Sequence, residues 1–482
     1  MGGQVLWHLK MVFSSLLFLL IFLPLTLVIY RGAPARAKNW VLLGASLVFY
    51  AWGAPRFVFV LIVSCLLDYY FGQKLVPSVP LRHRQAWLAL CLVYNLGLLG
   101  YFKYANFMVE QGNRFLELFQ LHPLVWTTVV LPIGISFFTF HKISYLVDVY
   151  RGTVPPARGL RDYILYIVLF PQLIAGPIIR YHDVARQLTD RDHPASRMFE
   201  GIWRFAIGMA KKVLIANPLA GIADGAFGTP VTGLDPGTAW VGLLAYAFQI
   251  YFDFSGYSDM AIGLGRMFGF EFLENFNRPY TAHNFTDFWR RWHISLSNFM
   301  KEYLYVPLGG NRVGWFRGSM NLWLVFIVSG FWHGASWSFI LWGCYHGFFL
   351  SLDKLIGTSR LARIPGWLAV PVTFLLVCGG WVLFRAETLS HAGHYFAALA
   401  GAHGSLGWPN GIASRSTWVL ALAPLCVWGP AGWARLTIHA PVGGSFGRWN
   451  APLRYGFAWL LLVLSAAALA TGQFNPFIYF RF

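Results

Sequence analysis

The chain has 482 residues, of which 57% are hydrophobic and only 12% are charged. Soluble domains average about 25% charged residues, so a soluble core of this size would leave too little polar surface to face water. The positive mean hydropathy of +0.53 agrees. We therefore expect a multi-spanning integral membrane protein whose working parts are polar residues held inside the membrane. Many of its 22 Trp and 22 Tyr residues are expected at the lipid–water interface.

The formal net charge of +18 would suggest nucleic-acid binding in a soluble protein. Here no basic domain stands apart from the apolar runs, so we expect no nucleic-acid partner. The basic residues cluster between those runs and predict a cytoplasmic face, where anionic membrane lipid or a phosphorylated substrate can bind. The five Cys residues lie in apolar stretches without a CxxC pair, which is typical of small core residues and not of disulfides or a zinc site.

Apolar runs near or above about 18 residues recur along the chain and predict about ten to twelve membrane crossings. The expected fold is an all-α polytopic transmembrane helical bundle with re-entrant or interfacial helices, because several runs are short. We expect a single domain over residues 1–482, with residues 1–10 as a candidate N-terminal extension. The predicted spans are 11–30, 39–53, 56–73, 86–108, 124–148, 161–180, 201–227, 238–265, 320–343, 344–357, 367–385, 417–434 and 455–471.

The first run, 11–30, could be mistaken for a signal peptide, because Lys10 precedes it. It ends at Tyr30-Arg31-Gly32 without a small-residue cleavage site, so we interpret it as a first span. If the basic connection at 31–38 is cytoplasmic, the N-terminus lies outside.

The stretch 275–318 is the largest amphipathic region of the sequence. Its charged residues lie among apolar residues at helical spacing, as in helices that keep aromatic rings in the headgroup layer and cations outward. The pattern also fits a membrane-surface helix without any chemistry. The charged residues are Asp287, Arg290, Arg291 and Lys301, and the apolar ones are Phe285, Phe288, Trp289, Trp292, Leu296 and Phe299.

The run from Met320 to Trp342 contains no Asp, Glu, Lys or Arg, yet His333 lies near its middle. An ionisable group at membrane depth costs roughly a few kcal/mol unless it is solvated or paired, so such groups are functional candidates. Gly330 and Gly334 flank His333 at small-residue spacing and would let another helix or a substrate approach closely. The alternative is a neutral imidazole that donates to a backbone carbonyl.

A second polar group lies inside the apolar run 238–265. Gln249, Asp253 and Tyr257 fall at i, i+4 and i+8 and therefore share one helix face, whereas Asp259 lies on another face. These residues could orient a catalytic group or bind substrate, or they could hold helices together. The pattern itself favours the structural alternative.

The remaining histidines give weaker signals. His293 lies in the basic amphipathic region and could bind a substrate, act as a second acid or base, or be a surface residue. His141 and His346 lie in apolar stretches and are interpreted as packed. No pair of histidines has helical ligand spacing with a third ligand nearby, so we expect no metal. Walker A, GxSxG and dinucleotide-binding patterns are absent.

Taken together and in order, these segments resemble the membrane-bound O-acyltransferase family, and most closely its bacterial branch that acts on alginate or teichoic acids. The resemblance covers nearly the whole chain, from residue 11 to residue 482. One departure is His141, where that branch usually has Gln or a similar residue, and it leaves the role of His141 open. The matching segments are 11–15, 131–137, 145–152, 170–178, 251–259, 288–296, 307–312 and 332–334.

The resemblance implies a catalytic role for His333 and a second polar position, at the cytoplasmic side, for His293. It also implies helices around a central tunnel in the bacterial inner membrane, with acyl-CoA, most simply acetyl-CoA, as donor substrate. The acceptor would be a periplasmic acyl-accepting protein or an exopolysaccharide such as alginate. Candidate substrate-binding residues are Arg290, Arg291 and Arg312 for the phosphates of coenzyme A, together with Trp332, Asp253 and Tyr257.

In such a reaction a neutral His333 would take the proton of an attacking hydroxyl and return it to the leaving thiolate. The sequence does not identify the donor that stabilises the oxyanion. Three alternatives remain open: transfer of D-alanine or another acyl group to a cell-wall polymer, a polysaccharide transporter, and a non-catalytic scaffold of an export complex.

Overall fold

The computed structural model describes residues 11–191, 195–230, 233–402, 414–429, 451–471 and 477–478, and the candidate extension 1–10 lies outside these residues. Regular secondary structure in the described part is entirely helical, which confirms the all-α prediction. The chain divides into two compact units, and each is described by itself. The first unit is Met1–Gly201 with Ala261–Leu273, and the second is Ile202–Met260 with Glu274–Phe482. The single-domain expectation stays a prediction.

The first unit begins with helices that follow the predicted spans closely. A π-helical turn leads directly into the first α-helix. Residues 11–15 of the span predicted at 11–30 are not helical. The predictions at 39–53 and 56–73 are confirmed as helices, whereas the run at 86–108 is part of a longer helical stretch. The elements are η1 (Phe18–Phe22), α2 (Leu23–Gly32), α3 (Ala35–Gly53), α4 (Phe57–Gly72), α5 (Leu81–Leu99), η2 (Gly100–Tyr104) and α6 (Ala105–Leu118).

The span predicted at 124–148 is wrong in its first half, because residues 121–132 form no helix. Pro123 and Pro132 remove backbone donors at both ends of this segment, and four β-branched residues at 127–130 disfavour a helix between them. Asn106 of α6 replaces the missing helical bonds, because its amide accepts from the Val129 N–H and donates to the Val129 carbonyl, both at 2.9 Å. The helix that follows is α7 (Ile135–Arg151).

The span predicted at 161–180 is also broken. Leu169 leaves the helical region, with φ −51° and ψ 110°, and Pro171 and the Gly176-Pro177 pair cannot continue a regular helix. The segment therefore contains short helices joined by turns. These are α8 (Leu160–Val168), α9 (Phe170–Leu173) and α10 (Tyr181–Thr189).

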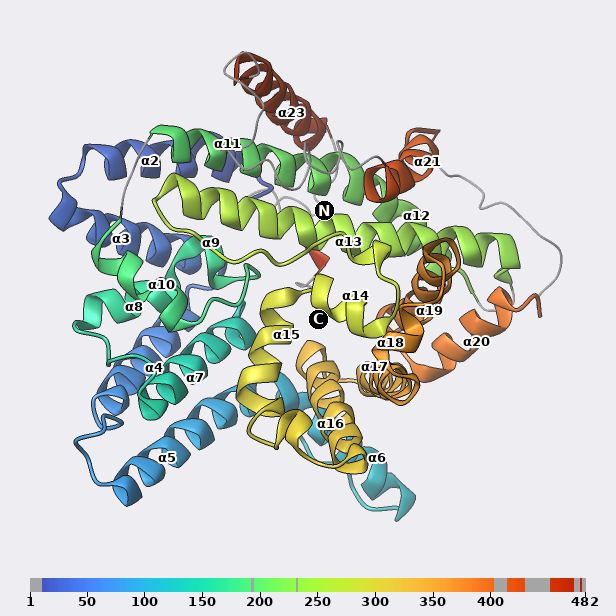
Figure 1. Cartoon of the computed structure of the whole chain (residues 1–482), viewed down its shortest axis with the longest axis horizontal. Helices are drawn as coiled ribbons and strands as arrows, with labels where there is room; N and C mark the ends of the chain where they lie inside the picture. Colours follow the sequence, from blue (N-terminus) through green and yellow to red (C-terminus); the bar gives the residue numbers. More distant parts are fainter. Residues whose placement is uncertain are drawn as a thin grey trace. The chain divides into compact units, whose positions relative to one another are not determined.

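Two long helical stretches pass from one unit into the other and confirm the helices predicted at 201–227 and 238–265. Within the second unit they approach closely, because a Cβ on Gly208 would lie 2.5 Å from the Gly256 carbonyl oxygen. The first stretch comprises α11 (Ala195–Ala210), the π-helical η3 (Lys211–Ala216) and α12 (Asn217–Phe227), and the second is α13 (Pro236–Met267). Figure 1 shows α13 as the long yellow-green helix.

The amphipathic region 275–318 does not form one surface helix. His293 has φ 45°, a left-handed conformation that interrupts the helix. The apolar side chains that suggested rings in the headgroup layer are buried in protein, with Phe288 and Leu296 each 1% exposed, so that prediction is wrong. The elements are η5 (Pro279–Thr281), α14 (Phe285–Arg291), α15 (Ile294–Met300), η6 (Lys301–Tyr305) and η7 (Gly310–Arg312).

Two neighbouring helices of the second unit, α16 (Trp315–His333) and α17 (Trp337–Ile356), lie side by side (Figure 1). Their backbones approach at Gly330 and Gly343, where an added Cβ would collide with the Phe339 and Phe326 carbonyls. The close approach predicted at Gly330 is thus confirmed. The predicted boundaries 320–343 and 344–357 are wrong, because α16 ends at His333 and the next helix begins at Trp337. His333 lies at a helix end, not within one.

The rest of the second unit is helical where it is described. The spans predicted at 367–385 and 455–471 are confirmed as helices, and residues 430–434 of the span predicted at 417–434 lie outside the described residues. Two helices of this part, α18 and α20, were not predicted. The elements are α18 (Thr358–Leu361), α19 (Gly366–Arg385), α20 (Leu389–Leu399), α21 (Ser414–Trp428) and α23 (Ala451–Thr471).

Among the described residues, 4 helices are long and apolar enough to cross a membrane. This supports the membrane prediction, whereas the predicted number of crossings stays a prediction. Shorter apolar helices occur at Phe18–Gly32, Phe57–Gly72 and Ser416–Trp428. The long helices are Leu81–Leu118, Ala195–Phe227, Gly366–Arg385 and Pro452–Thr471.

Candidate active site

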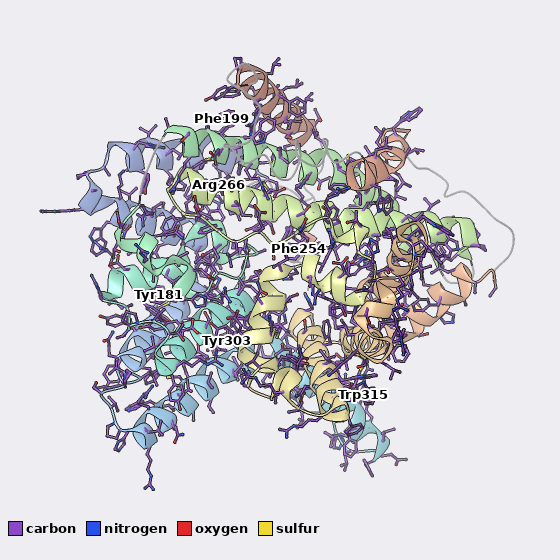
Figure 2. All side chains as sticks on the ribbon, viewed as in Figure 1. Tyr181, Phe199, Phe254, Arg266, Tyr303 and Trp315 are labelled. Atoms are coloured by element: carbon purple, nitrogen blue, oxygen red, sulfur yellow. The ribbon has the colours of Figure 1, made fainter. Side chains whose placement is uncertain are left out.

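His293 is the residue at which α14 gives way to α15, and its side chain is fully buried. A non-glycine residue with positive φ is uncommon and costs of order 1 kcal/mol or more, so it persists only where its surroundings fix it. Phe254 of α13, labelled in Figure 2, meets the imidazole edge-on with ring centroids 4.6 Å apart. Burial lowers the pKa of His293 to about 3, so the ring is neutral at physiological pH.

His333 ends α16 and is buried among aromatic rings from three helices. The ring centroids of Trp332, Trp342 and Phe384 lie 4.9, 5.2 and 5.2 Å from that of the imidazole. The imidazoles of His293 and His333 are 6.5 Å apart, centroid to centroid. The structure thus brings together the two histidines that the sequence predicted as catalytic. Trp332, predicted to bind substrate, contacts both rings, since its centroid is 6.4 Å from that of His293.

Sequence reasoning missed Asn275, whose amide oxygen lies 3.1 Å from His293 Nδ1. It is fully buried in the extended segment before α14. An isolated asparagine in such a segment has no periodicity that would mark it. Its neighbour in space, His293, lies 18 residues further along the chain, so the contact depends on tertiary structure.

His346 was predicted to be packed, and its contacts support that interpretation. It is fully buried on α17, and the Trp289 indole N–H donates to its Nδ1 at 3.2 Å. Its ring also lies 4.7 Å from that of Trp342, which in turn contacts His333. His346 therefore supports the aromatic wall behind the candidate site.

The carboxylates predicted on α13 are held in buried ion pairs with lysines that sequence reasoning did not single out. Asp253 pairs with Lys212 and accepts a hydrogen bond from the Ile478 N–H at 2.8 Å. Asp259 pairs with Lys211 at 2.6 Å and also with Arg204. These contacts favour the structural interpretation of both carboxylates. The ring of Tyr257, on the same helix, contacts that of Phe477 at a tilt, with the ring centroids 4.5 Å apart.

Comparison with known proteins shows which family of enzymes this chain resembles. The sequence profile of the membrane-bound O-acyltransferase family matches residues 157–382, which include both histidines. The "Probable alginate O-acetylase AlgI" of Pseudomonas putida is 42% identical over 493 residues, which cover 98% of this chain and 100% of the relative. The chain belongs to the membrane-bound O-acyltransferase family. It is an O-acyltransferase, and its reaction uses an acyl donor.

Two further relatives carry different acceptors in their names. The "Peptidoglycan O-acetyltransferase" of Helicobacter pylori is 38% identical over 82% of this chain and 80% of its own length. The "Teichoic acid D-alanyltransferase" of Bacillus subtilis is 28% identical over 54% of this chain and 70% of its own length. The resemblance stated from the sequence motifs is therefore confirmed.

The three arginines predicted for this acyltransferase are more exposed than its buried histidines. Arg290 on α14 and Arg312 in η7 are exposed, and Arg291 forms an i,i+4 ion pair with Asp287 at 2.8 Å. Exposed guanidinium groups can reach a phosphorylated substrate in water, whereas the histidines require a substrate that enters the protein. Within the described ranges, no group of three or more His, Cys, Asp and Glu side chains could hold a metal ion.

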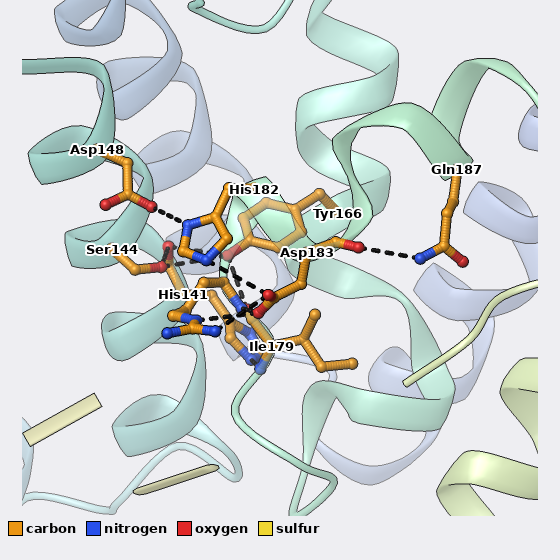
Figure 3. Close-up of polar contacts among 9 residues, drawn as sticks. His141, Ser144, Asp148, Tyr166, Ile179, His182, Asp183 and Gln187 are labelled. Atoms are coloured by element: carbon orange, nitrogen blue, oxygen red, sulfur yellow. Dashed lines mark hydrogen bonds and ion pairs between the residues drawn. The ribbon is translucent and has the colours of Figure 1, made fainter. Parts of the chain in front are cut away.

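The first unit of this acyltransferase contains a separate polar cluster, drawn in Figure 3. His182 lies 2.8 Å from Asp148 and 3.3 Å from Asp183, so both ring nitrogens face carboxylates. Hydrogen bonds to Asp148 and Asp183 raise the pKa of His182 to about 9. Arg180 completes the cluster through a 3.0 Å ion pair with Asp183. None of these four residues was proposed as a site from the sequence.

His141 lies beside this cluster, and its polar groups are used within the fold. Its Nε2 accepts from the Ile179 N–H at 3.4 Å, and its backbone carbonyl accepts from the hydroxyls of Ser144 and Tyr166 at 2.8 and 3.2 Å. Figure 3 shows these contacts between α7, α8 and the segment that leads into α10. They support the interpretation of His141 as packed.

Proposed function

We propose that this O-acyltransferase transfers an acetyl group from cytoplasmic acetyl-CoA, across the bacterial inner membrane, to a hydroxyl of an extracytoplasmic polysaccharide. The group passes directly or through a periplasmic acyl-accepting protein. The names of the alginate and peptidoglycan relatives support the acetyl group and the polymer. The observation that carries the proposal is the pair of buried imidazoles, 6.5 Å apart and walled by aromatic rings.

The chemistry needs a base, because a hydroxyl is a poor nucleophile until its proton is removed. His333 accepts the hydroxyl proton while the oxygen attacks the thioester carbonyl carbon and a new C–O bond forms. The C–S bond then breaks, and His333 returns the same proton to the leaving thiolate. His293, the second polar group, acts as an additional acid or base. The products are the acetyl ester and free coenzyme A.

The aromatic rings around His333 make the surroundings of the proposed reaction apolar. Trp332, Trp342 and Phe384 place aromatic rings around His333. Exclusion of water protects a thioester from hydrolysis and strengthens the electrostatic interactions of a transition state. In this proposal the wall belongs to a central tunnel that opens to both faces of the membrane, with the short helices of residues 275–318 at its cytoplasmic side.

The donor's phosphates remain outside the tunnel. The guanidinium groups of Arg290, Arg291 and Arg312 bind them, since guanidinium forks match phosphate oxygens. Trp332 contacts the acyl end of the donor. Asp253 and Tyr257 keep α13 in place behind the site through the Lys212 ion pair and the contact with Phe477.

Transfer of D-alanine to teichoic acid is a second candidate, favoured by the match to the Bacillus subtilis relative. A donor bound to a carrier protein would replace coenzyme A in that reaction. The transporter and scaffold alternatives are set aside, because the chain belongs to an acyltransferase family.

The test uses purified protein in liposomes, with labelled acetyl-CoA outside and His333→Ala beside the wild type. Thermal unfolding must first show that the variant is folded. We expect the wild type to consume the thioester and His333→Ala to lose about 100-fold or more of that rate. Equal turnover in both proteins would overturn the assignment of His333. If a carrier-bound D-alanyl thioester is consumed and acetyl-CoA is not, the second candidate replaces the first.

A further inference from the structure

Asn275 is the side chain that ties the junction between α14 and α15 to α13. Its amide Nδ2 donates to the Ser258 hydroxyl of α13 at 3.1 Å. Its Oδ1 accepts from the Ser295 N–H and hydroxyl at 3.1 and 2.9 Å and lies 3.1 Å from His293 Nδ1. Its backbone carbonyl accepts from the Ile294 N–H at 3.0 Å. One buried residue thus contacts three consecutive residues of the junction.

These bonds replace a cap that the helix lacks. His293 occupies the N-cap position of α15 but makes no capping hydrogen bond with its side chain. The first N–H groups of a helix have no partner within the helix. Asn275 supplies acceptors to two of them, those of Ile294 and Ser295. The contacts therefore stabilise the left-handed backbone of His293 without a capping bond from its imidazole.

The orientation of the Asn275 amide follows from the Ser295 N–H. A backbone N–H can only donate, so the amide atom facing it must be the oxygen and not the NH2 group. In the opposite orientation the amide oxygen would face Ser258, whose hydroxyl could turn to donate to it. The amide NH2 would then face the Ser295 N–H, and two hydrogen-bond donors would oppose each other. The hydrogen-bond network thus assigns Oδ1 to the side that faces His293.

This orientation determines where the imidazole carries its hydrogen. An amide oxygen is an acceptor only, so His293 Nδ1, 3.1 Å away, must be the protonated nitrogen. In the neutral ring the other nitrogen, Nε2, then carries the lone pair. An amide oxygen orients a catalytic histidine in the same way in Cys-His-Asn proteases.

We infer that Asn275 is a positioning residue of the acyl transfer, which fixes His293 as its Nδ1–H tautomer and thereby makes Nε2 the nitrogen that accepts a proton. The inference rests on the proposed function, in which His293 takes part. It also sharpens that function, because a neutral His293 can receive a proton at Nε2 but has none to give there. His293 therefore enters the reaction as a base that takes up the hydroxyl proton relayed from His333, and it acts as an acid only when it gives that proton back for return to the leaving thiolate.

The test compares three variants with the wild type in proteoliposomes. Asn275→Asp keeps an acceptor for His293 and Ser295, and the Ser258 hydroxyl can turn to donate to the new carboxylate. Asn275→Leu has a similar volume and no acceptor. Asn298→Asp is the matched control, because it places the same new charge on α15, at a half-buried position. Thermal unfolding shows whether each variant is folded.

The first readout is independent of activity. Solid-state ¹⁵N NMR on histidine-labelled protein, with His293→Gln to assign the signals, distinguishes a protonated Nδ1 from a protonated Nε2. We expect the Nδ1–H tautomer in the wild type, in Asn275→Asp and in the control. In Asn275→Leu we expect a mixture of tautomers. A wild-type His293 protonated at Nε2 would overturn the inference.

The second readout is thioester turnover. We expect Asn275→Leu to lose about 100-fold in kcat, as general-base catalysis is lost, while KM for acetyl-CoA changes less than threefold. Asn275→Asp should stay within about tenfold of the wild type. A folded Asn275→Leu with wild-type kcat would contradict the inference. Full turnover in His293→Gln would instead overturn the role of His293 in the proposed function, whatever tautomer the spectra show.

Discussion

Each unit contains a histidine centre, and the two centres are built in opposite ways: His182 in the first unit is half-buried, whereas His293 and His333 in the second are buried. In the first unit both nitrogens of His182 face carboxylates, and Arg180 balances the second carboxylate (Figure 3). In the second unit His333 lies among tryptophan and phenylalanine rings, and His293 faces the neutral amide of Asn275.

This difference in surroundings distinguishes a structural histidine from one that can take part in proton transfer. Carboxylates on both sides hold His182 as an imidazolium, and its proton is therefore difficult to exchange. A neutral imidazole in an apolar enclosure keeps a basic nitrogen, which is what a general base requires. The charge of the groups that face the imidazole therefore distinguishes the two roles.

The largest expected effect on folding concerns the buried ion pair of the first unit. Lys142 and Asp68 lie 2.8 Å apart with no side-chain exposure, and Asn95 donates to the same carboxylate at 2.8 Å. Lys142→Met leaves an uncompensated buried charge, so we expect a loss of about 3–5 kcal/mol in unfolding free energy, measured by denaturant titration. The double variant Lys142→Met/Asp68→Leu should recover most of that loss. A fully stable single variant would show that the pair does not stabilise the fold.

The next effect concerns the close contact of α16 with α17. An added Cβ at Gly330 would collide with the Phe339 carbonyl, so Gly330→Ala should cost about 1–3 kcal/mol and displace the end of α16. Because His333 lies at that end, thioester turnover should also fall. Gly314→Ala is the matched control, since nothing lies within 4 Å of its added Cβ. Equal losses in the two variants would count against the role of the contact.

A smaller effect is expected from the pH dependence of His182. The folded pKa is raised to about 9, and the unfolded pKa is about 6.5. Its contribution to stability is therefore fully present below about pH 6.5 and is lost as the pH rises to about 9. His182→Gln should lower Tm by roughly 2–4 °C at pH 6 and have little effect at pH 10. An equal Tm loss at both pH values would contradict the ion pairing.

The smallest effect is expected at the exposed arginines. Arg312→Ala should raise KM for acetyl-CoA by roughly threefold to tenfold and leave kcat unchanged, because a phosphate contact contributes equally to ground state and transition state. Arg317→Ala removes an equally exposed charge nearby and serves as control. If both variants raise KM equally, the effect is one of net charge and not of a specific contact.

The sequence pointed to His333 because a lone ionisable group in an apolar run is costly and therefore conspicuous, whereas His293 was assigned through the family resemblance. His333 stands out in this way, with Gly330 and Gly334 beside it. The sequence did not predict that His333 ends a helix, since residues 334–336 are small and uncharged and the apolar run resumes directly after them. Hydrophobicity alone does not locate such a break.

The sequence was misleading in the region of α14 and α15. Phe288 and Leu296 follow a helical period, but the same period suits a helix that faces lipid and one that faces protein. The structure buries both side chains. The left-handed conformation of His293, which breaks the period, depends on bonds from Asn275 and so on the tertiary fold.

The ion pairs within each unit were also beyond sequence reasoning. The sequence showed that Asp253 places a carboxylate in an apolar run, where burial of a charge is unfavourable. Its partner Lys212, however, is 41 residues away in the chain. The same holds for Asp68 and Lys142, which lie on α4 and α7. Apolar runs predict where such charges are buried, whereas only helix packing decides which of them meet.

One measurement tests the contrast between the two centres most directly: thioester turnover and Tm of His333→Gln and His182→Gln, side by side in liposomes. We predict that His333→Gln loses about 100-fold or more in kcat and keeps its Tm, because its role is that of a base. His182→Gln should lose stability and keep kcat. If His182→Gln abolished turnover at unchanged Tm while His333→Gln remained active, the assignment of chemistry to the second unit would be wrong.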